Sequence, residues 1–312
     1  MKPEILLVEP MMPGIEAALD ADYTVHRLSA APDRERFVAE VGPRVRAVVT
    51  GGGTGVSNAV MDACPNLGIV TINGVGTDAV DLKHAQSKGV RVTNTPDVLN
   101  DDVADLAIGL MIMASRRMAV GDRFVRAGQW PKGKLPLARK VTGKRLGILG
   151  LGRIGLAIAE RAAGFGMAIS YTNRKPRTDV PYRFVASPVD LARDSDILIV
   201  AASAGPESRN MVNRAVIEAL GPDGLLVNVA RGSVVDEPEL VAALQDGRLG
   251  GAGLDVFANE PHAPEALFAL DNVVLQPHQA SATVETRTAM GDLVLSNLKA
   301  FFAGQPLLTP VV

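Results

Sequence analysis

The sequence is poor in the residue types that mark several classes of protein. It has one cysteine, Cys64, in 312 residues, which excludes an intrachain disulfide and fits a reducing compartment. Aromatic residues make up only 4% of the chain, which argues against surfaces that stack on nucleic-acid bases. The formal net charge of -2 gives no general attraction to nucleic acids or acidic membranes. We therefore expect neither partner, and we interpret Cys64 as a buried packing residue.

Long apolar runs and a secretory signal are also missing. No stretch reaches the roughly 18 consecutive apolar residues that identify a membrane helix. The first residues, Met1 to Glu4, lack the basic and apolar regions of a signal peptide. The four histidines and the one cysteine are too scattered to give the spacing of a zinc site. These absences predict a cytoplasmic protein without a metal centre.

Short apolar runs alternate with helical patterns along the chain. At roughly 100–200 residues per domain, the length predicts two domains. Strands separated by helices are typical of domains in which helices cover both faces of a parallel sheet. The first series of expected strands covers 5–8, 46–50, 67–72 and 90–92. The second covers 146–149, 168–171, 197–200, 225–229, 253–256 and 273–275, about six strands, as in a doubly wound dinucleotide fold.

Two longer helices are expected outside these strands. One follows Asn100 and has Asp101 and Asp102 near its start, where carboxylates suit the positive end of the helix dipole. Its apolar residues cover almost the whole circumference, which predicts burial between domains or subunits. The other covers 285–302 and ends at Gly304, because a glycine readily takes the conformation that terminates a helix.

A glycine motif follows the first strand of the second series. It consists of Gly150, Leu151, Gly152, Arg153, Ile154 and Gly155. Its position between a strand and an alanine-rich helix is the context in which such a motif binds a dinucleotide. The glycines allow a tight turn, a close approach of the pyrophosphate and close helix packing, while the helix N-terminus offers free amides. The alternative is a glycine turn without a ligand.

The residues after the next strand bear on which dinucleotide binds. NAD-binding proteins place an acidic residue about 20 residues after the glycine motif, where it holds the ribose hydroxyls. Here Asn173, Arg174 and Lys175 occupy this place, and no carboxylate occurs before Asp179. Such residues can donate hydrogen bonds and supply positive charge to a 2′-phosphate. The turn favours NADP over NAD, although an ordinary solvated basic turn remains an alternative.

Three polar residues follow the last expected strands. Arg231, Glu260 and His278 should lie at the carboxyl ends of parallel strands, where ligands of open sheets bind. One reaction that these residue types could catalyse beside a nicotinamide is the reduction of a 2-keto acid. This reaction needs a proton donor for the carbonyl oxygen and a positively charged partner for the carboxylate and the carbonyl. His278 suits the first role, supported by Glu260, which would orient the ring and favour the imidazolium. Arg231 suits the second role because its donors form a fixed fork.

Each of these residues also has an ordinary interpretation. Arg231 could pair with Asp236 or Glu237, Glu260 could be a turn residue before proline, and His278 could be a satisfied loop residue. Their joint placement at three strand ends argues for a site. Of the other histidines, only His262 competes for the catalytic role.

In combination, these motifs resemble those of the D-isomer-specific 2-hydroxyacid dehydrogenases. The resemblance runs from about Ile69 to Ser281. It is carried by the segments 73–78, 94–96, 103–105, 150–155, 230–233, 255–261 and 277–278. It implies that Arg231, Glu260 and His278 are catalytic and that the amides of Val75 and Gly76 hold the substrate carboxylate. Implied cofactor contacts are the glycine motif, Asn173, Arg174, Lys175, Val229, Ala230, Arg231, Asp255, His278 and Ala280.

The same resemblance implies a fold and an assembly. A Rossmann cofactor domain, 98–285, would be inserted into a flavodoxin-like substrate domain formed by 1–97 and 286–312. The family is usually dimeric through the cofactor domain. In the most similar branch, the NADPH-preferring glyoxylate and hydroxypyruvate reductases, a tryptophan can reach the partner's site. Trp130 occupies the matching position here, and the alternative is that it only anchors the dimer.

These observations lead to one main prediction and several alternatives. We expect NADPH-dependent reduction of glyoxylate or hydroxypyruvate to the D-2-hydroxy acid. Departures from the family pattern at Asn100, at Gln279 and Ala280 and in 201–205 leave the cofactor contacts and substrate size open. Alternatives are an NAD-dependent enzyme for a larger acid such as 3-phosphoglycerate, a nucleotide-sensing module without turnover and, less well supported, a methyltransferase.

Overall fold

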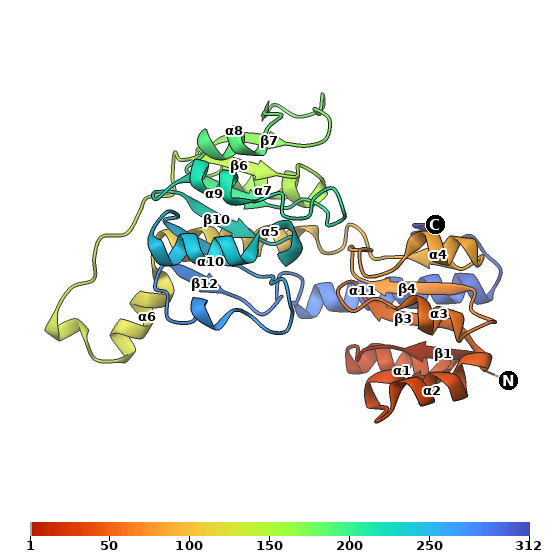
Figure 1. Ribbon diagram of the computed structural model, residues 1–312. Coiled ribbons are helices and arrows are strands. Elements are labelled where there is room, and N and C mark those ends of the chain that lie inside the picture. The colour runs from red at the N-terminus through yellow and green to blue at the C-terminus, as the bar shows by residue number, and fades with distance from the viewer. Residues whose placement is uncertain (1) are drawn as a thin grey trace. The chain divides into compact units, whose positions relative to one another are not determined.

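The computed structural model describes residues 2–312, which divide into two compact units. The discontinuous unit comprises the residues up to Leu99 together with Thr283–Val312, and the inserted unit is Asn100–Ala282. The boundaries expected from the sequence are 97/98 and 285/286. Each unit is a parallel sheet with helices on both faces. In Figure 1 the discontinuous unit combines the red and orange segments with the blue helix α11.

The sheet of the discontinuous unit has the strand order β2-β1-β3-β4-β5, and every adjacent pair is parallel. This is the flavodoxin-like order, as expected. The strands are β1 (Glu4–Leu7), β2 (Thr24–Arg27), β3 (Val45–Gly51), β4 (Ile69–Asn73) and β5 (Arg91–Thr93).

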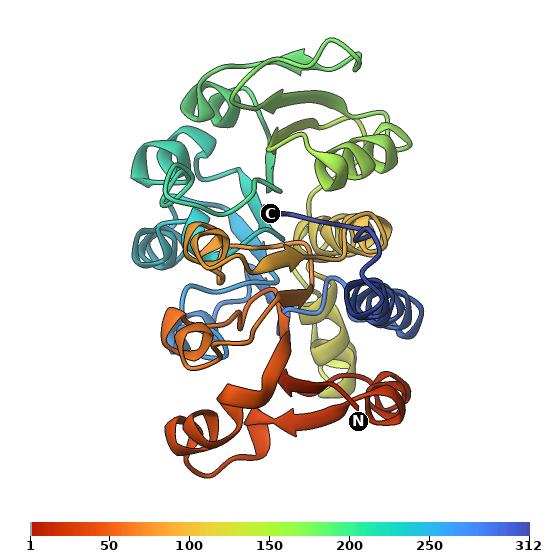
Figure 2. The same ribbon diagram turned by 90° about the vertical axis from the view of Figure 1, so that its right-hand side faces the viewer.

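Successive residues of these strands point to opposite faces of the sheet, and each face has its own apolar core. Ile5 and Leu7 pack with α1 (Pro13–Asp22) and α11 (Val284–Phe302). Leu6 packs on the opposite face, which is covered by α2 (Arg34–Val41), α3 (Asn58–Asp62) and α4 (Leu82–Ser87). Figure 2 shows these two helical layers on either side of the strands.

The sheet of the inserted unit has the order β12-β11-β10-β9-β6-β7-β8, again entirely parallel. Apart from one further edge strand, this is the dinucleotide-binding order. The strands are β6 (Arg145–Leu149), β7 (Ala168–Thr172), β8 (Arg183–Phe184), β9 (Ile197–Val200), β10 (Leu225–Asn228), β11 (Gly251–Leu254) and β12 (Val273–Leu275).

Two groups of helices cover this sheet. On one face α5 (Asn100–Ser115) packs against α7 (Arg153–Ala163) and against β10 and β11. The predicted burial of α5 is therefore achieved largely within its own unit. On the other face, α8 (Pro188–Arg193), α9 (Arg214–Leu220) and α10 (Glu237–Asp246) contribute to an apolar core. The helix α6 (Met118–Arg126) stands apart from the sheet in Figure 1.

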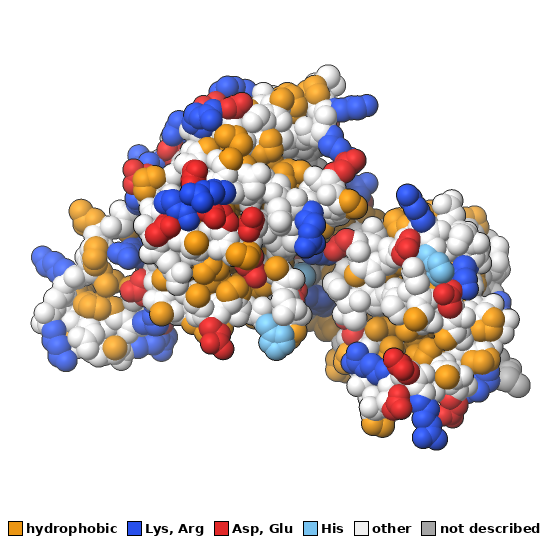
Figure 3. All heavy atoms as spheres, viewed as in Figure 1, with side chains coloured by type: hydrophobic (Ala, Val, Ile, Leu, Met, Phe, Trp, Pro, Cys, Tyr) orange, Lys and Arg blue, Asp and Glu red, His pale blue; other side chains and the backbone are white. Residues whose placement is uncertain are grey.

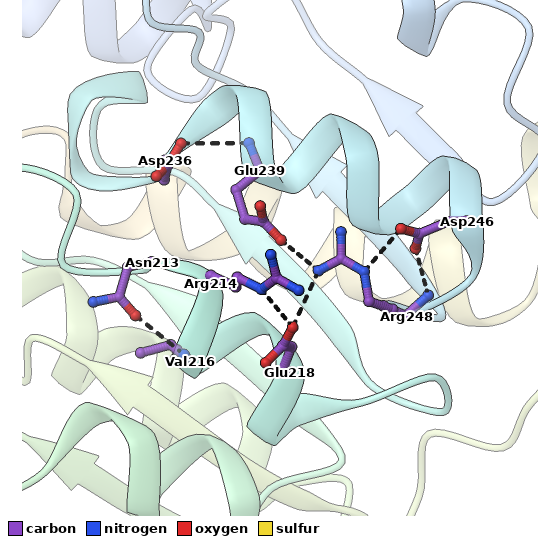
Figure 4. Close-up of polar contacts among 8 residues, drawn as sticks. All are labelled: Asn213, Arg214, Val216, Glu218, Asp236, Glu239, Asp246 and Arg248. Atoms are coloured by element: carbon purple, nitrogen blue, oxygen red, sulfur yellow. Dashed lines mark hydrogen bonds and ion pairs between the residues drawn. The ribbon is translucent and has the colours of Figure 1, made fainter.

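An ion-pair network joins α9 to α10, as shown in Figure 4. The Arg248 guanidinium contacts Glu239 and lies 2.8 Å from Asp246 and 3.5 Å from Glu218. Glu218 also accepts a hydrogen bond of 2.7 Å from Arg214. The hydrogen bonds from Arg248 to Glu239 and Asp246 raise the pKa of the arginine, which therefore remains charged. The network links two helices that cover the same face of the sheet.

The sequence analysis missed two edge strands. In β2 the side chains of Thr24 and His26 are polar, so the run lacks a strong apolar signal. In β8 only two residues, Arg183 and Phe184, have strand pairing. Across residues 2–312, no helix is long and apolar enough to cross a membrane. The described residues also contain no group of three or more side chains suited to hold a metal ion.

Candidate active site

The strand order places the glycine motif at the point where the chain reverses direction across the sheet. The central strand β6 has β7 on one side and β9 on the other: the chain runs outward from β6 through β7 to β8 and then crosses back to β9 on the other side of β6. Ligands of doubly wound sheets bind at the carboxyl ends of such neighbouring strands. The motif begins at Gly150, directly after β6, and leads into α7.

The three motif glycines have different steric surroundings. Gly150 has a positive φ of 99°, and a Cβ there would lie 2.5 Å from Ala202 Cα. A Cβ on Gly155 would lie 2.2 Å from the carbonyl oxygen of Gly150. At Gly152, the residue that precedes α7, no described heavy atom lies within 4 Å of the same position. The outer glycines are required by packing, whereas Gly152 leaves open space at a helix N-terminus. This arrangement fits a dinucleotide pyrophosphate.

The turn after β7 contacts the glycine motif directly. Asn173 Oδ1 accepts a hydrogen bond of 2.7 Å from the Leu151 amide, and Asn173 Nδ2 donates to the Leu151 carbonyl at 3.4 Å. The Asn173 side chain, which the sequence assigns to the 2′-phosphate, thus also contacts the glycine motif. Arg174 is 90% exposed and lies 3.4 Å from Glu207, and Lys175 is also exposed. Both remain accessible basic groups at this end of the sheet.

Arg231, Glu260 and His278 come from segments that follow three neighbouring strands, β10, β11 and β12. Asn228 shapes the first segment, because its side chain accepts from the Ala230 amide and donates to the Arg231 carbonyl, both at 3.0 Å. The positive charge of Arg231 contributes to lowering the pKa of Glu260. The fold therefore brings together the three residues that were selected from the sequence.

Glu260 and His278 form a close pair. His278 Nδ1 lies 2.6 Å from Glu260 Oε2, while Glu260 Oε1 accepts a hydrogen bond of 3.0 Å from the Phe257 amide. Burial opposes ionisation of Glu260, but the hydrogen bonds from His278 and Phe257 outweigh it and lower the pKa of this carboxyl. An ionised Glu260 fixes the ring orientation and leaves Nε2 of His278 as its other functional nitrogen.

Asp255 holds the segment that carries the histidine. Its side chain is completely buried and accepts hydrogen bonds from the Gln279 amide at 2.6 Å and from the Ala280 amide at 3.0 Å. The His278 amide donates to the Asp255 carbonyl at 2.8 Å. Burial raises the pKa of Asp255 although the two amides act in the opposite direction. His278 itself has a positive φ of 55°, which this network supports.

The remaining histidines, and the acidic residues considered as partners of Arg231, make contacts elsewhere. Asp236 caps α10 by accepting from the Glu239 amide, and Glu237 accepts from the Ala258 amide at 2.9 Å. His26 and His84 lie 2.7 Å from Glu4 and 2.9 Å from Asp62, in the discontinuous unit. His262 is exposed, and its described hydrogen bond is made by its backbone amide.

A pocket of about 270 Å³ adjoins the Glu260–His278 pair within the inserted unit. Sequence reasoning did not identify this pocket, because its residues come from an irregular segment and an edge strand. It is lined by Phe257, Glu260, Pro261, Ala263, Phe268, Leu275, Gln276, Pro277 and His278. Most of these side chains are apolar, so the pocket suits an apolar group next to the acid–base pair.

The expected carboxylate-binding loop belongs to the discontinuous unit. Val75 and Gly76 follow β4, and both are partly exposed. The Asn94 side chain donates to the Val75 carbonyl at 2.9 Å, and the Thr95 amide donates to the Gly74 carbonyl at 2.9 Å. These bonds from the segment after β5 hold the loop at the carboxyl edge of the sheet.

Comparison with known proteins assigns the family. Residues 108–280 match the family model for the NAD-binding domain of D-isomer-specific 2-hydroxyacid dehydrogenases. A hydroxyphenylpyruvate reductase from Plectranthus scutellarioides is 53% identical over 99% of this chain and 98% of its own length. The chain belongs to the D-isomer-specific 2-hydroxyacid dehydrogenase family. It is an oxidoreductase of that type.

Two further proteins are similar to this chain over its whole length. A glyoxylate/hydroxypyruvate reductase A from Arabidopsis thaliana is 49% identical over 99% of this chain and 98% of its own. An NADPH-dependent glyoxylate/hydroxypyruvate reductase from Sinorhizobium meliloti, solved with NADP and malonate, matches with a TM-score of 0.92. It is 42% identical, and the match covers 100% of this chain and 97% of that one. The predicted family and fold class are thus confirmed.

Proposed function

We propose that this dehydrogenase uses NADPH to reduce a small 2-keto acid, glyoxylate or hydroxypyruvate, to the D-2-hydroxy acid. The observation that carries the proposal is the Glu260–His278 pair at the strand ends beside Arg231. Two of the compared proteins are named for these substrates. In this proposal the inserted unit binds the cofactor and the discontinuous unit binds the substrate.

The catalytic roles follow from the chemistry of the side chains. When bound, the nicotinamide supplies the hydride. His278 holds the proton for the carbonyl oxygen on Nε2, because Nδ1 is engaged by Glu260. The Glu260 carboxylate keeps the ring oriented. Arg231 neutralises the substrate carboxylate and polarises the carbonyl, and the amides of Val75 and Gly76 hold the same carboxylate.

The cofactor assignment rests on the glycine motif and the basic turn. The open space at Gly152 and the N-terminus of α7 would take the pyrophosphate. Arg174 and Lys175 would face the 2′-phosphate, because both are exposed and no carboxylate lies between the end of β7 and Asp179. Further contacts are proposed for residues after the neighbouring strands, namely Val229, Ala230, Asp255 and Ala280.

We also propose a homodimer built through the inserted unit. None of the residues in α6 (Met118–Arg126) is buried in the single chain. Apolar side chains in α6 and in the segment after it are exposed, including Val125 at 55%, Trp130 at 69% and Leu137 at 99%. Figure 3 shows hydrophobic side chains between basic ones on this part of the inserted unit, at the left of the view. Light scattering after gel filtration tests whether the protein is a dimer. The variant Trp130→Ala then distinguishes a tryptophan that only anchors the dimer from one that reaches the partner's active site. Loss of turnover in an intact dimer supports a contribution to the partner's site.

We also propose that the protein is located in the reducing environment of the cytoplasm. Its support is the single cysteine, which is 2% exposed and makes no disulfide. Fractionation of the source cells, followed by detection of the protein, tests this location.

The deciding experiment follows nicotinamide absorbance with glyoxylate, hydroxypyruvate and pyruvate, each with NADPH and with NADH. Rapid loss of NADPH with glyoxylate or hydroxypyruvate is the expected result. Turnover with NADH alone would retain the family and overturn the cofactor assignment. Absence of turnover with every pairing would favour a larger acid, and then a sensing role.

A second candidate substrate class is favoured by the pocket beside Glu260 and His278. Its apolar lining suits a 2-keto acid with an aromatic side chain, and one compared protein is named a hydroxyphenylpyruvate reductase. The test compares kcat/KM for hydroxyphenylpyruvate and hydroxypyruvate in wild type and in Ala263→Phe, which fills the pocket. Selective loss of the aromatic substrate would establish this second candidate, and equal effects would exclude it.

A further inference from the structure

Leu151 is held by two side chains from the turn after β7. Its amide donates to Asn173 Oδ1 at 2.7 Å, and its carbonyl accepts from Asn173 Nδ2 at 3.4 Å and from Arg177 Nη1 at 3.1 Å. The Leu151 side chain is completely buried. Both backbone polar groups of one residue in the glycine motif are therefore bonded to side chains of a separate segment.

Arg177 is itself fixed by several contacts. Its guanidinium forms a two-point ion pair with Asp179, with Nε 2.9 Å from Asp179 Oδ1. The Arg177 amide donates to the Tyr171 hydroxyl at 2.7 Å, and this hydroxyl donates to the Arg177 carbonyl at 3.3 Å. Tyr171 is fully buried in β7. A rigid strand thus anchors the arginine that contacts the glycine motif.

The basic residues of this turn differ in their surroundings: Arg177 is paired with an aspartate, whereas Arg174 and Lys175 are exposed. Asp179 offsets the charge of Arg177, and the hydrogen bond to this aspartate raises the pKa of the arginine. Arg174 and Lys175 are exposed, and Arg174 makes a long contact of 3.4 Å with Glu207. Asn173 is neutral and can both accept from and donate to Leu151, whereas an aspartate could only accept.

We propose that Asn173 and Arg177 are positioning residues that hold the pyrophosphate-binding loop through Leu151, a role separate from the 2′-phosphate contacts proposed above for Arg174 and Lys175. The proposal rests on the proposed function for the identity of the cofactor. Because both dinucleotides contain the same pyrophosphate, loss of the Leu151 clamp should weaken both equally. Loss of the exposed basic groups should weaken only the dinucleotide with the 2′-phosphate.

The test measures dissociation constants of NADPH and NADH by fluorescence titration, without a keto acid. Asn173→Ala and Arg177→Met should each raise both constants by a similar factor, about fivefold, as expected for a lost hydrogen bond. Arg174→Ala should raise the NADPH constant about tenfold, on the scale of a charge-assisted bond, and leave the NADH constant unchanged. Arg183→Met is a matched control, because Arg183 pairs with Asp194, away from the motif.

A selective loss of NADPH affinity in Asn173→Ala would overturn the proposal and make Asn173 a phosphate ligand. Unchanged affinities in both Asn173→Ala and Arg177→Met would also overturn it. Rescue of Arg177→Met by Arg177→Lys, which can still donate to Leu151, supports the clamp. Thermal melting of each variant separates loop positioning from global unfolding. Wild-type turnover tests the proposed function separately, since a failure there leaves the ratios of binding constants interpretable.

Discussion

The ring nitrogen Nδ1 of His278 lies 2.6 Å from Oε2 of Glu260. The two residues lie in segments that follow the neighbouring parallel strands β11 and β12. The Phe257 amide holds the carboxylate from the other side, and Asp255 holds the backbone after the histidine. The ring orientation is therefore fixed from several directions before any substrate binds.

Replacement of the histidine tests its role as the proton donor. His278→Gln should lower kcat by about 10²- to 10⁴-fold, the usual contribution of general acid catalysis. The NADPH dissociation constant should change little, because the glycine motif remains intact. Steady-state kinetics and direct titration measure the two effects. Full activity in this variant would remove His278 from the proton-transfer step.

Replacement of Glu260 should lower the rate of reduction. The pKa of Glu260 is lowered, so the group is ionised at neutral pH and is a charged partner for Nδ1 of His278. In Glu260→Gln that charge is lost and the ring is held less firmly, so kcat should fall in steady-state kinetics. A kcat equal to that of wild type would show that Glu260 does not position the ring.

The same carboxyl links stability to pH. A lowered pKa in the folded state means that the stabilisation is present above the unfolded-state pKa. It is lost as the pH falls through the folded-state value. Acid denaturation followed by circular dichroism should therefore begin at a higher pH for proteins that lack this ionised pair. His278→Gln, which removes the partner, should show this change relative to wild type.

The glycines of the motif should respond differently to alanine. Gly155→Ala should destabilise the fold, because its Cβ would lie 2.2 Å from the Gly150 carbonyl oxygen. Gly152→Ala should keep a near-normal melting temperature, because its Cβ has open space, but should weaken dinucleotide binding at the pyrophosphate. Melting curves with and without NADPH distinguish the two. Equal binding by Gly152→Ala and wild type would argue against a close approach of the pyrophosphate there.

Cys64 should be unreactive in the folded protein. Burial raises the pKa of its thiol to about 11, and its exposure is only 2%. Because the thiolate is the reactive species, iodoacetamide in mildly alkaline buffer should modify the native protein very slowly. Addition of denaturant should make the reaction fast, as mass spectrometry would show. Rapid modification without denaturant would mean that this part of the discontinuous unit opens readily.

Much of the fold was predictable because buried parallel strands are nearly continuous apolar runs. The strands β6 and β9 are examples, with four buried residues each. The catalytic candidates could be predicted from the sequence for a related reason, since each of them follows such a strand. By contrast, the sequence gives no sign that Asn173 contacts Leu151, 22 residues away. That contact depends on which strands are adjacent and on the direction of a side chain.

Arg177 was missed for a similar reason. It lies in an irregular segment between β7 and β8, where no periodic pattern indicates which side chains point inward. Its significance depends on Tyr171 and Asp179 acting together. Pairwise geometry of this kind is created by the folded chain, not by local sequence preference.

The final helix, α11, completes the unit that the first strands begin. Val294 and Leu298 share a core with Ile5 and Leu7, and the Val311 amide donates to the Val92 carbonyl at 2.7 Å. During synthesis on the ribosome, one apolar face of the first sheet therefore remains uncovered until α11, which follows the inserted unit in the chain, has been translated. The inserted unit is contiguous and can mature earlier. The order in which the two units are completed is thus the reverse of the order in which their first residues are translated.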